Sequence, residues 1–271
     1  MAQSPEYPDL KWVPPKSWTN ANRTSIQLVV IHDTEGSSHG QSAEDGAAYD
    51  QRRTDGTSAH YFVDNNSVVQ CVLTADQAHT ARTQGNRRGV QYELCARASW
   101  SKARWLDPTY GLPMLVRAAH QAARDARKWN IPVRKLSPAQ VAAGTKGFCG
   151  HGDITKAFPG DNGSHTDPGP NFPWSEFIEM VKKEMGETAP GRKLEYMKLS
   201  VNIPILKQGD RDDELPGYNL IDRIQKIVGA EDDGIWGPGT TAKIAEWCKV
   251  SNTAAKTLTE DIYRKVFGAS K

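Results

Sequence analysis

Residues 25–36, with the sequence SIQLVVIHDTEG, carry an apolar run that ends on a histidine. Positions 26 and 28–31 hold only Ile, Leu and Val, which is typical of a buried strand. His32 follows directly, and Asp33 and Glu35 come after it. Because rigid strands present functional side chains at their ends, we expect a core strand over 26–32 with a candidate site at His32. A histidine held by structural hydrogen bonds is the alternative, and the partners that the rest of the chain supplies decide between the two.

Strand patterns alternate with helix patterns through the first two thirds of the chain. Residues 58–72 have two β-rich runs joined by an Asp-Asn-Asn turn, which predicts a hairpin, and a further strand is predicted over 90–98. Apolar residues at helical spacing predict helices, which cover 44–54, 113–129, 137–144 and 172–186. This alternation predicts an α/β or α+β domain with a mixed sheet. Residues 1–24 are irregular and are expected to wrap this domain.

A polar stretch that contains Pro and Gly, GETAPGRKLEY, separates this domain from the end of the chain. We therefore divide the chain into a domain over 1–185, a linker over 186–196 and a second domain over 197–271. Helix patterns in the second domain cover 219–229, 232–250 and 257–268. They predict a small all-α domain of three helices, in which Trp236 on a Gly-rich turn is the most conspicuous side chain.

Composition excludes several classes of protein. The net charge is only +2 and the basic residues are scattered, so no nucleic acid partner is expected. No apolar run approaches the roughly 20 residues of a membrane span, so no membrane insertion is expected. The first 15 residues lack the features of a secretory signal, which predicts synthesis in the cytoplasm. The four cysteines have no CxxC spacing and are expected to be buried free thiols.

A second concentration of polar residues lies over 147–174, GFCGHGDITKAFPGDNGSHTDPGPNFPW. This stretch is rich in Gly and Pro, and we interpret it as a long irregular loop packed by its aromatic residues. Catalytic zinc is typically held by three protein ligands from His and carboxylate, with water in the fourth position. His32 and two groups of this loop would satisfy that count. The candidates within the loop are His151, His165, Asp167 and Cys149.

Five motifs in a fixed order resemble one enzyme family. They are VVIHDTEG, SAHYFVDNNSVVQCV with AHTA after it, YEL, and the GHGD and TDPGP blocks of the 147–174 stretch. Together they resemble the zinc-dependent N-acetylmuramoyl-L-alanine amidases, which include bacteriophage lysins, bacterial recycling amidases and animal peptidoglycan recognition proteins. The resemblance spans residues 24–182. It implies a mixed central β-sheet flanked by helices. It also implies hydrolysis of the amide bond between N-acetylmuramic acid and L-alanine in peptidoglycan, with one Zn²⁺ per chain.

The resemblance also assigns roles by position. It implies that the zinc ligands are His32, His151 and Asp167, and it leaves Cys149 as a packed thiol. Glu93 of the YEL motif matches the glutamate that serves as general base. Other branches of the family use a tyrosine that here is Ala59, which favours Glu93.

Three more histidines match family positions. His165 occupies the place of a lysine that stabilises the oxyanion, and imidazole can replace it only when protonated. His79 of the AHTA motif is expected to line the substrate groove. His60 is expected to be structural.

The second domain resembles a three-helix peptidoglycan-binding module through the motif DGIWGPGTT, which implies that Trp236 contacts the wall. The acidic stretch DRDDELPG departs from that pattern. A catalytic domain joined to a wall-binding module indicates a monomeric bacteriophage endolysin that lyses the host wall after the membrane is permeabilised. Two alternatives are a non-catalytic recognition protein and a cytoplasmic recycling amidase. A complete ligand set argues against the first, and the wall-binding module argues against the second.

Overall fold

The computed structural model describes residues 2–161 and 163–186, and further along the chain 196–198, 202–204, 206, 208, 220–230 and 235–267. The chain divides into two compact units, Met1–Gly186 (unit 1) and Glu187–Lys271 (unit 2). Almost all of the predicted linker over 186–196 lies outside the described residues. None of the described helices is long and apolar enough to cross a lipid bilayer.

Unit 1 is built on a mixed sheet with the strand order β1-β2-β5-β4-β6-β3-β7. The strands are β1 Ala2–Gln3, β2 Lys11–Trp12, β3 Leu28–Asp33, β4 Tyr61–Val63, β5 Val68–Gln70, β6 Gly89–Leu94 and β7 Gly147–Gly150. The apolar run before His32 is the interior strand β3, which pairs in parallel with β6 and β7 and is buried along its whole length. The predicted hairpin is the antiparallel pair β4–β5.

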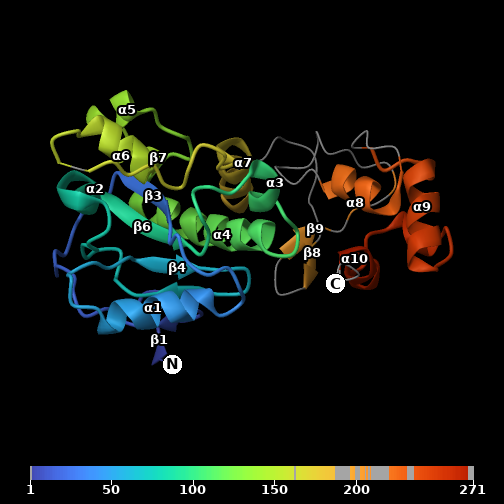
Figure 1. Ribbon diagram of the computed structural model, residues 1–271, viewed down its shortest axis with the longest axis horizontal. Coiled ribbons are helices and arrows are strands. Elements are labelled where there is room, and N and C mark those ends of the chain that lie inside the picture. Colours follow the sequence, from blue (N-terminus) through green and yellow to red (C-terminus); the bar gives the residue numbers. More distant parts are fainter. Residues whose placement is uncertain are drawn as a thin grey trace. The chain divides into compact units, whose positions relative to one another are not determined.

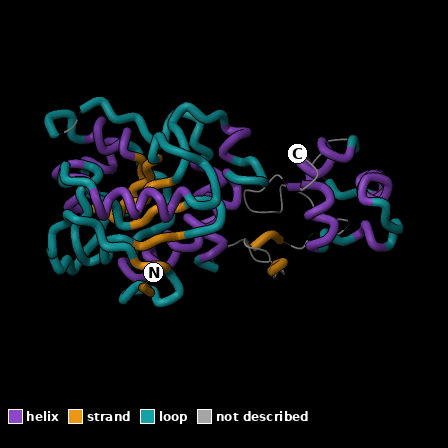
Figure 2. The backbone as a smooth tube through the Cα atoms, turned by 60° about the horizontal axis from the view of Figure 1, so that its bottom comes forward, coloured by secondary structure: helices purple, strands orange, loops and turns teal. Residues whose placement is uncertain are grey.

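Helices cover both faces of this sheet, as Figures 1 and 2 show. One face carries α4 (Gly111–Trp129), and α7 (Trp174–Glu184) packs on α4. The opposite face carries α1 (Ser42–Arg52), α2 (Arg82–Arg88), α5 (Pro138–Ala142) and α6 (His151–Ala157), and the short α3 (Lys102–Trp105) lies against α4. The predicted α/β architecture is therefore confirmed.

Alternation along β6 decides which side chains reach which face. The Tyr92 hydroxyl donates a hydrogen bond to Asp125 of α4, so Tyr92 faces that helix. Gln91 and Glu93 on either side of it point to the opposite face. This is also the face of His32, because Glu93 stands directly beside His32 in the parallel register. The face opposite α4 thus receives His32 of β3 together with Gln91 and Glu93 of β6.

One expectation about local structure is wrong. The Gly-rich stretch 147–174 does not begin as an irregular loop, because Gly147–Gly150 forms the buried strand β7 and His151–Ala157 forms α6. Only residues 158–173 of this stretch lack a helix or strand in the described part of the chain. The helices α2 and α3 are also not predicted by the sequence pattern.

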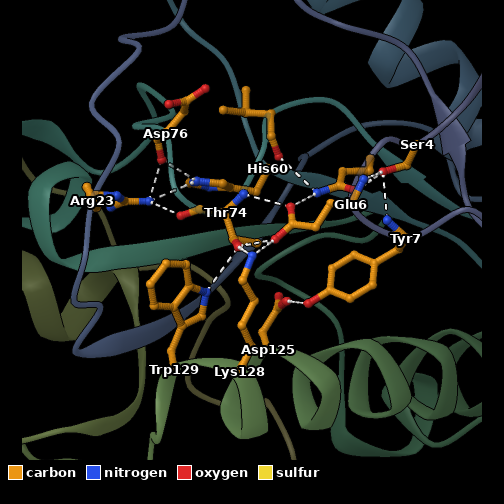
Figure 3. Close-up of polar contacts among 12 residues, drawn as sticks. Ser4, Glu6, Tyr7, Arg23, His60, Thr74, Asp76, Asp125, Lys128 and Trp129 are labelled. Carbon is orange, nitrogen blue, oxygen red and sulfur yellow. Dashed lines mark hydrogen bonds and ion pairs between the residues drawn. The ribbon is translucent and has the colours of Figure 1, made fainter.

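The first part of the N-terminal segment lies against α4, as Figure 3 shows for Glu6 and Tyr7, whereas Arg23 later in the segment contacts His60 and the Asp76 carbonyl. The Tyr7 hydroxyl donates to Asp125 Oδ1 at 2.6 Å. The Glu6 carboxylate accepts from the Thr74 backbone N–H at 2.9 Å and pairs with Lys128 of α4. Asp125 itself is fully buried. These contacts tie the first residues to the sheet and to α4, so the segment wraps unit 1 as expected.

All four cysteines are free and buried, which confirms that expectation. Cys149 of β7 packs in an apolar cluster with Leu28, Val30 and Ile154 among others. Burial there raises the pKa of the Cys149 thiol well above its usual range. Cys149 is therefore a core residue, as the sequence indicates.

The described part of unit 2 contains the three predicted helices, α8 (Leu220–Val228), α9 (Pro238–Cys248) and α10 (Glu260–Phe267). A 3₁₀ turn, η2 (Ala254–Lys256), precedes α10, and a hairpin that the sequence does not predict pairs β8 (Tyr196–Lys198) with β9 (Asn202–Pro204). Helix α9 packs against both α8 and α10. The acidic stretch over 210–217 lies outside the described residues.

Candidate metal centre and substrate cleft

Three side chains far apart in the sequence converge at one edge of the unit 1 sheet. His32 lies near the carboxyl end of β3, and His151 begins α6 directly after β7. Because β3 and β7 are parallel neighbours, their carboxyl ends meet at the same edge. Asp167 reaches this edge from the segment before α7. One donor atom from each of the three residues lies within 4.8 Å of the other two.

The distances between the donor atoms are near those of a tetrahedral ion site. His32 Nδ1 lies 2.9 Å from Asp167 Oδ2, and His151 Nδ1 lies 3.3 Å from Asp167 Oδ1. Ligands at 2.0–2.2 Å from a tetrahedral zinc ion stand about 3.3–3.6 Å from one another. Two imidazoles, one carboxylate and an open fourth position are the donor set of many catalytic zinc sites. The residues present therefore fit zinc in their chemistry, and they lie close enough together to share one ion, although the 2.9 Å between His32 and Asp167 is a hydrogen-bond distance.

Two glycines allow the Asp167 segment to approach α6. A Cβ on Gly150 would stand 2.6 Å from Pro168 Cδ, and a Cβ on Gly152 would stand 3.3 Å from the Thr166 backbone. The Gly152 N–H also donates to the Asp167 carbonyl oxygen at 3.0 Å. The GHG sequence around His151 thus gives the room and the backbone contact that place Asp167 beside both imidazoles.

The charges at the three residues favour a bound cation. Burial raises the pKa of Asp167, but hydrogen bonds from His151 and His32 lower it by more, so this carboxylate is ionised. Burial lowers the pKa of His151 to about 4, which keeps its ring neutral and able to act as a ligand at neutral pH. Burial also lowers the pKa of His32, yet Asp167 outweighs this and the pKa rises to about 9. The field that attracts a proton to His32 will equally attract a metal ion.

Glu93 on β6 lies next to His32 across the parallel pair and lines the same cleft. Its side chain is half-buried, and Oε2 has no hydrogen-bond partner among the described residues. Burial raises the pKa of Glu93 to about 8; His32 lowers it, while Asp167 and Asp33 raise it. A carboxyl group that lines a cleft and has a raised pKa is suited to proton transfer.

Two other candidate histidines, His79 and His165, also lie near the metal ligands. The His165 side chain is 44% exposed, and its ring stacks on that of His151 at 4.0 Å between centroids. His165 Nδ1 lies 3.9 Å from Asp167 Oδ1. Both nitrogens of His79 have partners, Thr19 Oγ1 at 2.9 Å and the Gly56 carbonyl at 3.0 Å. Both histidines line the cleft, as the sequence predicts.

The cleft has a volume of about 710 Å³, which is in the range of small-molecule sites. Ala59, at the position where other family branches have tyrosine, is part of its wall. Its rim includes Tyr49 of α1, which is 56% exposed and has the Arg53 guanidinium 4.9 Å from its ring centroid. No motif in the sequence points to these two residues, although Arg53 follows Tyr49 by four positions at the end of α1.

In unit 2, the expected contact between Trp236 and the wall is not possible, because the ring is buried. Trp236 has no exposed surface and donates from Nε1 to Thr241 Oγ1 at 3.0 Å, so it is a core residue. A buried ring cannot stack on a wall polymer, and the expected contact between Trp236 and peptidoglycan is wrong for this structure. A cleft of about 530 Å³ lies nearby, between the end of α8 and the first turns of α9, and Thr240 and Lys243 are in its lining.

Several solved structures are similar to the chain at low identity. The Staphylococcus aureus hydrolase AmiA, determined with its ligand, is 18% identical with a TM-score of 0.49, over 68% of this chain and 88% of that chain. The N-acetylmuramoyl-L-alanine amidase LysC from Clostridium intestinale is 14% identical with a TM-score of 0.42, over 66% and 98%. A mutant endolysin from Bacillus subtilis is 16% identical with a TM-score of 0.41, over 64% and 98%.

Comparison with curated proteins gives no match. The profile of one protein family, described as N-acetylmuramoyl-L-alanine amidase, matches residues 22–170 of the 271. The match contains both histidines and the aspartate of the candidate metal centre, and it covers more than half of the chain. The chain therefore belongs to the N-acetylmuramoyl-L-alanine amidase family.

Proposed function

We propose that the protein is a zinc-dependent amidase that cuts the bond between the lactyl group of N-acetylmuramic acid and L-alanine in peptidoglycan. The observation that carries this proposal is the convergence of His32, His151 and Asp167 in an open cleft of a chain that belongs to this family. Zinc bound by these residues supplies a Lewis acid that polarises the scissile carbonyl and acidifies the attacking water.

Glu93 is the proposed general base. In this role its carboxylate, which lines the cleft, accepts the proton of the attacking water and later passes it to the leaving amine of L-alanine. The positive charge of a nearby ion lowers the pKa of a carboxyl group, which increases the ionised fraction of Glu93 at neutral pH. Its position beside His32 in the parallel register supports this role.

His165 is the proposed oxyanion stabiliser. Its half-exposed ring lies over that of His151 and faces the cleft, where an N–H group can donate to charge that develops on the scissile carbonyl oxygen. His79 is held by Thr19 and Gly56, and we assign it to the wall of the substrate groove.

The ends left on digested peptidoglycan test the reaction. We expect mass spectrometry of digested cell walls to find a free lactyl carboxyl on N-acetylmuramic acid and a free amine on L-alanine. Glycan ends with new reducing sugars would instead indicate a glycosidase, and cuts within the stem peptide would indicate an endopeptidase. Walls incubated with heat-denatured protein serve as the control.

We also propose that the chain acts on the intact wall, as a bacteriophage endolysin does. Unit 2 supports this role, since it carries the DGIWGPGTT motif and a cleft beside α9. A freely diffusing recycling amidase needs no such anchor, and a non-catalytic recognition protein needs neither Glu93 nor a complete ligand set.

Removal of unit 2 tests whether this unit binds the wall without taking part in catalysis. A chain that ends at Gly186 should keep its turnover on a soluble muropeptide, because α7 closes unit 1 by packing on α4 before this point. Its rate on intact walls should fall by up to about 10², since tethering raises the local concentration of substrate. Release of soluble fragments by the two chains measures both rates. Equal losses on soluble and insoluble substrate would contradict the assignment of unit 2 to wall binding.

A further inference from the structure

A buried amide lies behind the candidate metal centre. Gln91 of β6 has no exposed surface, and its Oε1 lies 2.9 Å from His32 Nε2. It stands two residues before Glu93, on the same face of the sheet. Gln91 therefore contacts His32 Nε2 from behind, while Glu93 lines the cleft. The inner nitrogen of His32 thus faces Gln91 while the outer nitrogen faces Asp167.

The orientation of the Gln91 amide follows from its second contact. Gln91 Nε2 donates to the Gly85 carbonyl oxygen of α2 at 2.9 Å. A backbone carbonyl can only accept, so the amide nitrogen must be on the Gly85 side and the oxygen on the His32 side. Gln91 Oε1 is also only an acceptor. His32 Nε2 must therefore carry a proton, which leaves Nδ1 as the nitrogen of a neutral ring that can bind a metal ion.

The surroundings prevent Gln91 from leaving this position. Its backbone N–H donates to His60 Nδ1 at 3.0 Å, and a Cβ on Gly89 would stand 2.8 Å from its Nε2. His60 is fully buried, and its Nε2 donates to the Asp76 carbonyl at 3.1 Å. Arg23 also contacts that carbonyl, as Figure 3 shows. His60 therefore has a structural contact that holds β6, in agreement with its expected role.

His151, the other histidine of the candidate metal centre, has no comparable hydrogen bond. His151 Nε2 is buried and has no hydrogen-bond partner among the described residues, and its ring rests on His165. Hydrogen bonds to the far nitrogen of a metal-bound histidine orient the ring and raise its basicity. In the proposed zinc site, a hydrogen bond thus orients the His32 ring, whereas no hydrogen bond among the described residues orients the far nitrogen of His151.

We infer that Gln91 is a positioning residue for the metal centre, which fixes the His32 ring and reserves Nδ1 for zinc. This inference rests on the proposed function, since it requires zinc at His32, His151 and Asp167. Gln91 does not touch the substrate cleft, so its effect passes entirely through His32. The Gly85 carbonyl acts indirectly: it accepts from Gln91 Nε2 and so orients Gln91 Oε1 toward His32.

Zinc affinity measured by competition with a chelator tests the inference. Gln91→Leu keeps the volume but removes the acceptor, and we expect zinc to bind about 10–100-fold more weakly. Gln91→Glu keeps an acceptor for His32 Nε2 but has no N–H for the Gly85 carbonyl, so it should restore only part of the affinity. The matched control is Gln121→Leu, since Gln121 is an equally buried amide on α4 that donates to the Tyr61 hydroxyl. This control should bind zinc as the parent does.

Nuclear magnetic resonance of the ¹⁵N-labelled, zinc-loaded parent gives a second measurement that needs no variant. We expect a proton on His32 Nε2 and the metal on Nδ1. Metal on Nε2, or unchanged zinc affinity in Gln91→Leu, would overturn the inference while leaving the proposed function intact. A parent protein that binds no zinc would overturn both.

Discussion

Asp167→Ala should remove zinc from the protein and reduce peptidoglycan hydrolysis to background. Asp167 contacts both candidate imidazole ligands, and it is the negatively charged member of the three. Without it the site keeps only two neutral donors. We therefore expect that zinc no longer stays bound through purification. Metal analysis of the purified protein, together with release of soluble wall fragments, measures both effects.

His165→Ala is the matched control for that variant, because His165 lies two residues away and faces the same cleft. It should keep one zinc per chain and lose only part of its turnover. Zinc loss in His165→Ala with zinc retained in Asp167→Ala would show that the ligand of this segment is the histidine. Treatment of the parent with a strong chelator should reproduce the activity of Asp167→Ala, and hydrolysis that survives complete metal removal would contradict the zinc-dependent reaction.

Glu93→Gln should keep both zinc and fold but lose about 10²–10⁴-fold in kcat, the usual contribution of a general base. The amide has the shape of the carboxyl group but cannot take a proton from water. In the parent, activity should fall as the pH is lowered, because protonated Glu93 also cannot accept a proton. Turnover of a soluble muropeptide and zinc content measure the two parts of this prediction.

Asp45→Asn supplies the comparison for Glu93→Gln. Asp45 is a carboxylate in the lining of the same cleft, but its side chain is 64% exposed and it lies outside the metal centre. Its neutralisation should change kcat by only a few-fold. If Glu93→Gln also stays within a few-fold of the parent, Glu93 is a half-buried strand residue without a role in proton transfer.

Much of unit 1 could be predicted because its strands and helices have simple patterns. The apolar run before His32 and the helix around residues 113–129 bury most of their side chains, so burial and periodicity agree. His32 is predicted from the residues as the end of a core strand, whereas the choice of His151 and Asp167 rests on the family resemblance. The residues alone leave four candidates in the 147–174 stretch.

The two wrong predictions, an irregular loop from Gly147 and a wall contact by Trp236, concern residue types that occur in more than one structural setting. Glycine is common in loops, but Gly147 lies in a buried strand, and a Cβ there would stand 2.8 Å from the Arg134 carbonyl oxygen. This glycine marks a close approach of two segments rather than a turn. Trp236 is similar, since a large apolar ring on a Gly-rich turn is as useful to a small core as to a binding surface.

Gln91 shows what sequence patterns cannot reveal. Its signal is a single amide within the strand GVQYEL, which could as well be a solvent-facing residue. Its meaning depends on the His32 ring and the Gly85 carbonyl, which come from other elements. Such contacts are visible only once the strands are placed in register.

The long separation of two proposed zinc ligands in the sequence has a consequence for how an ion would bind. His32 and Asp167 are 135 residues apart, and only the assembled sheet brings them together. An unfolded chain must meet the loop-closure entropy before such ligands can come together, which favours zinc binding to the folded protein over zinc acting as a template for folding. In the proposed site, zinc would stabilise the native state by RT ln(1 + [Zn²⁺]/Kd). On this proposal the protein folds before it loads zinc, unlike a zinc finger.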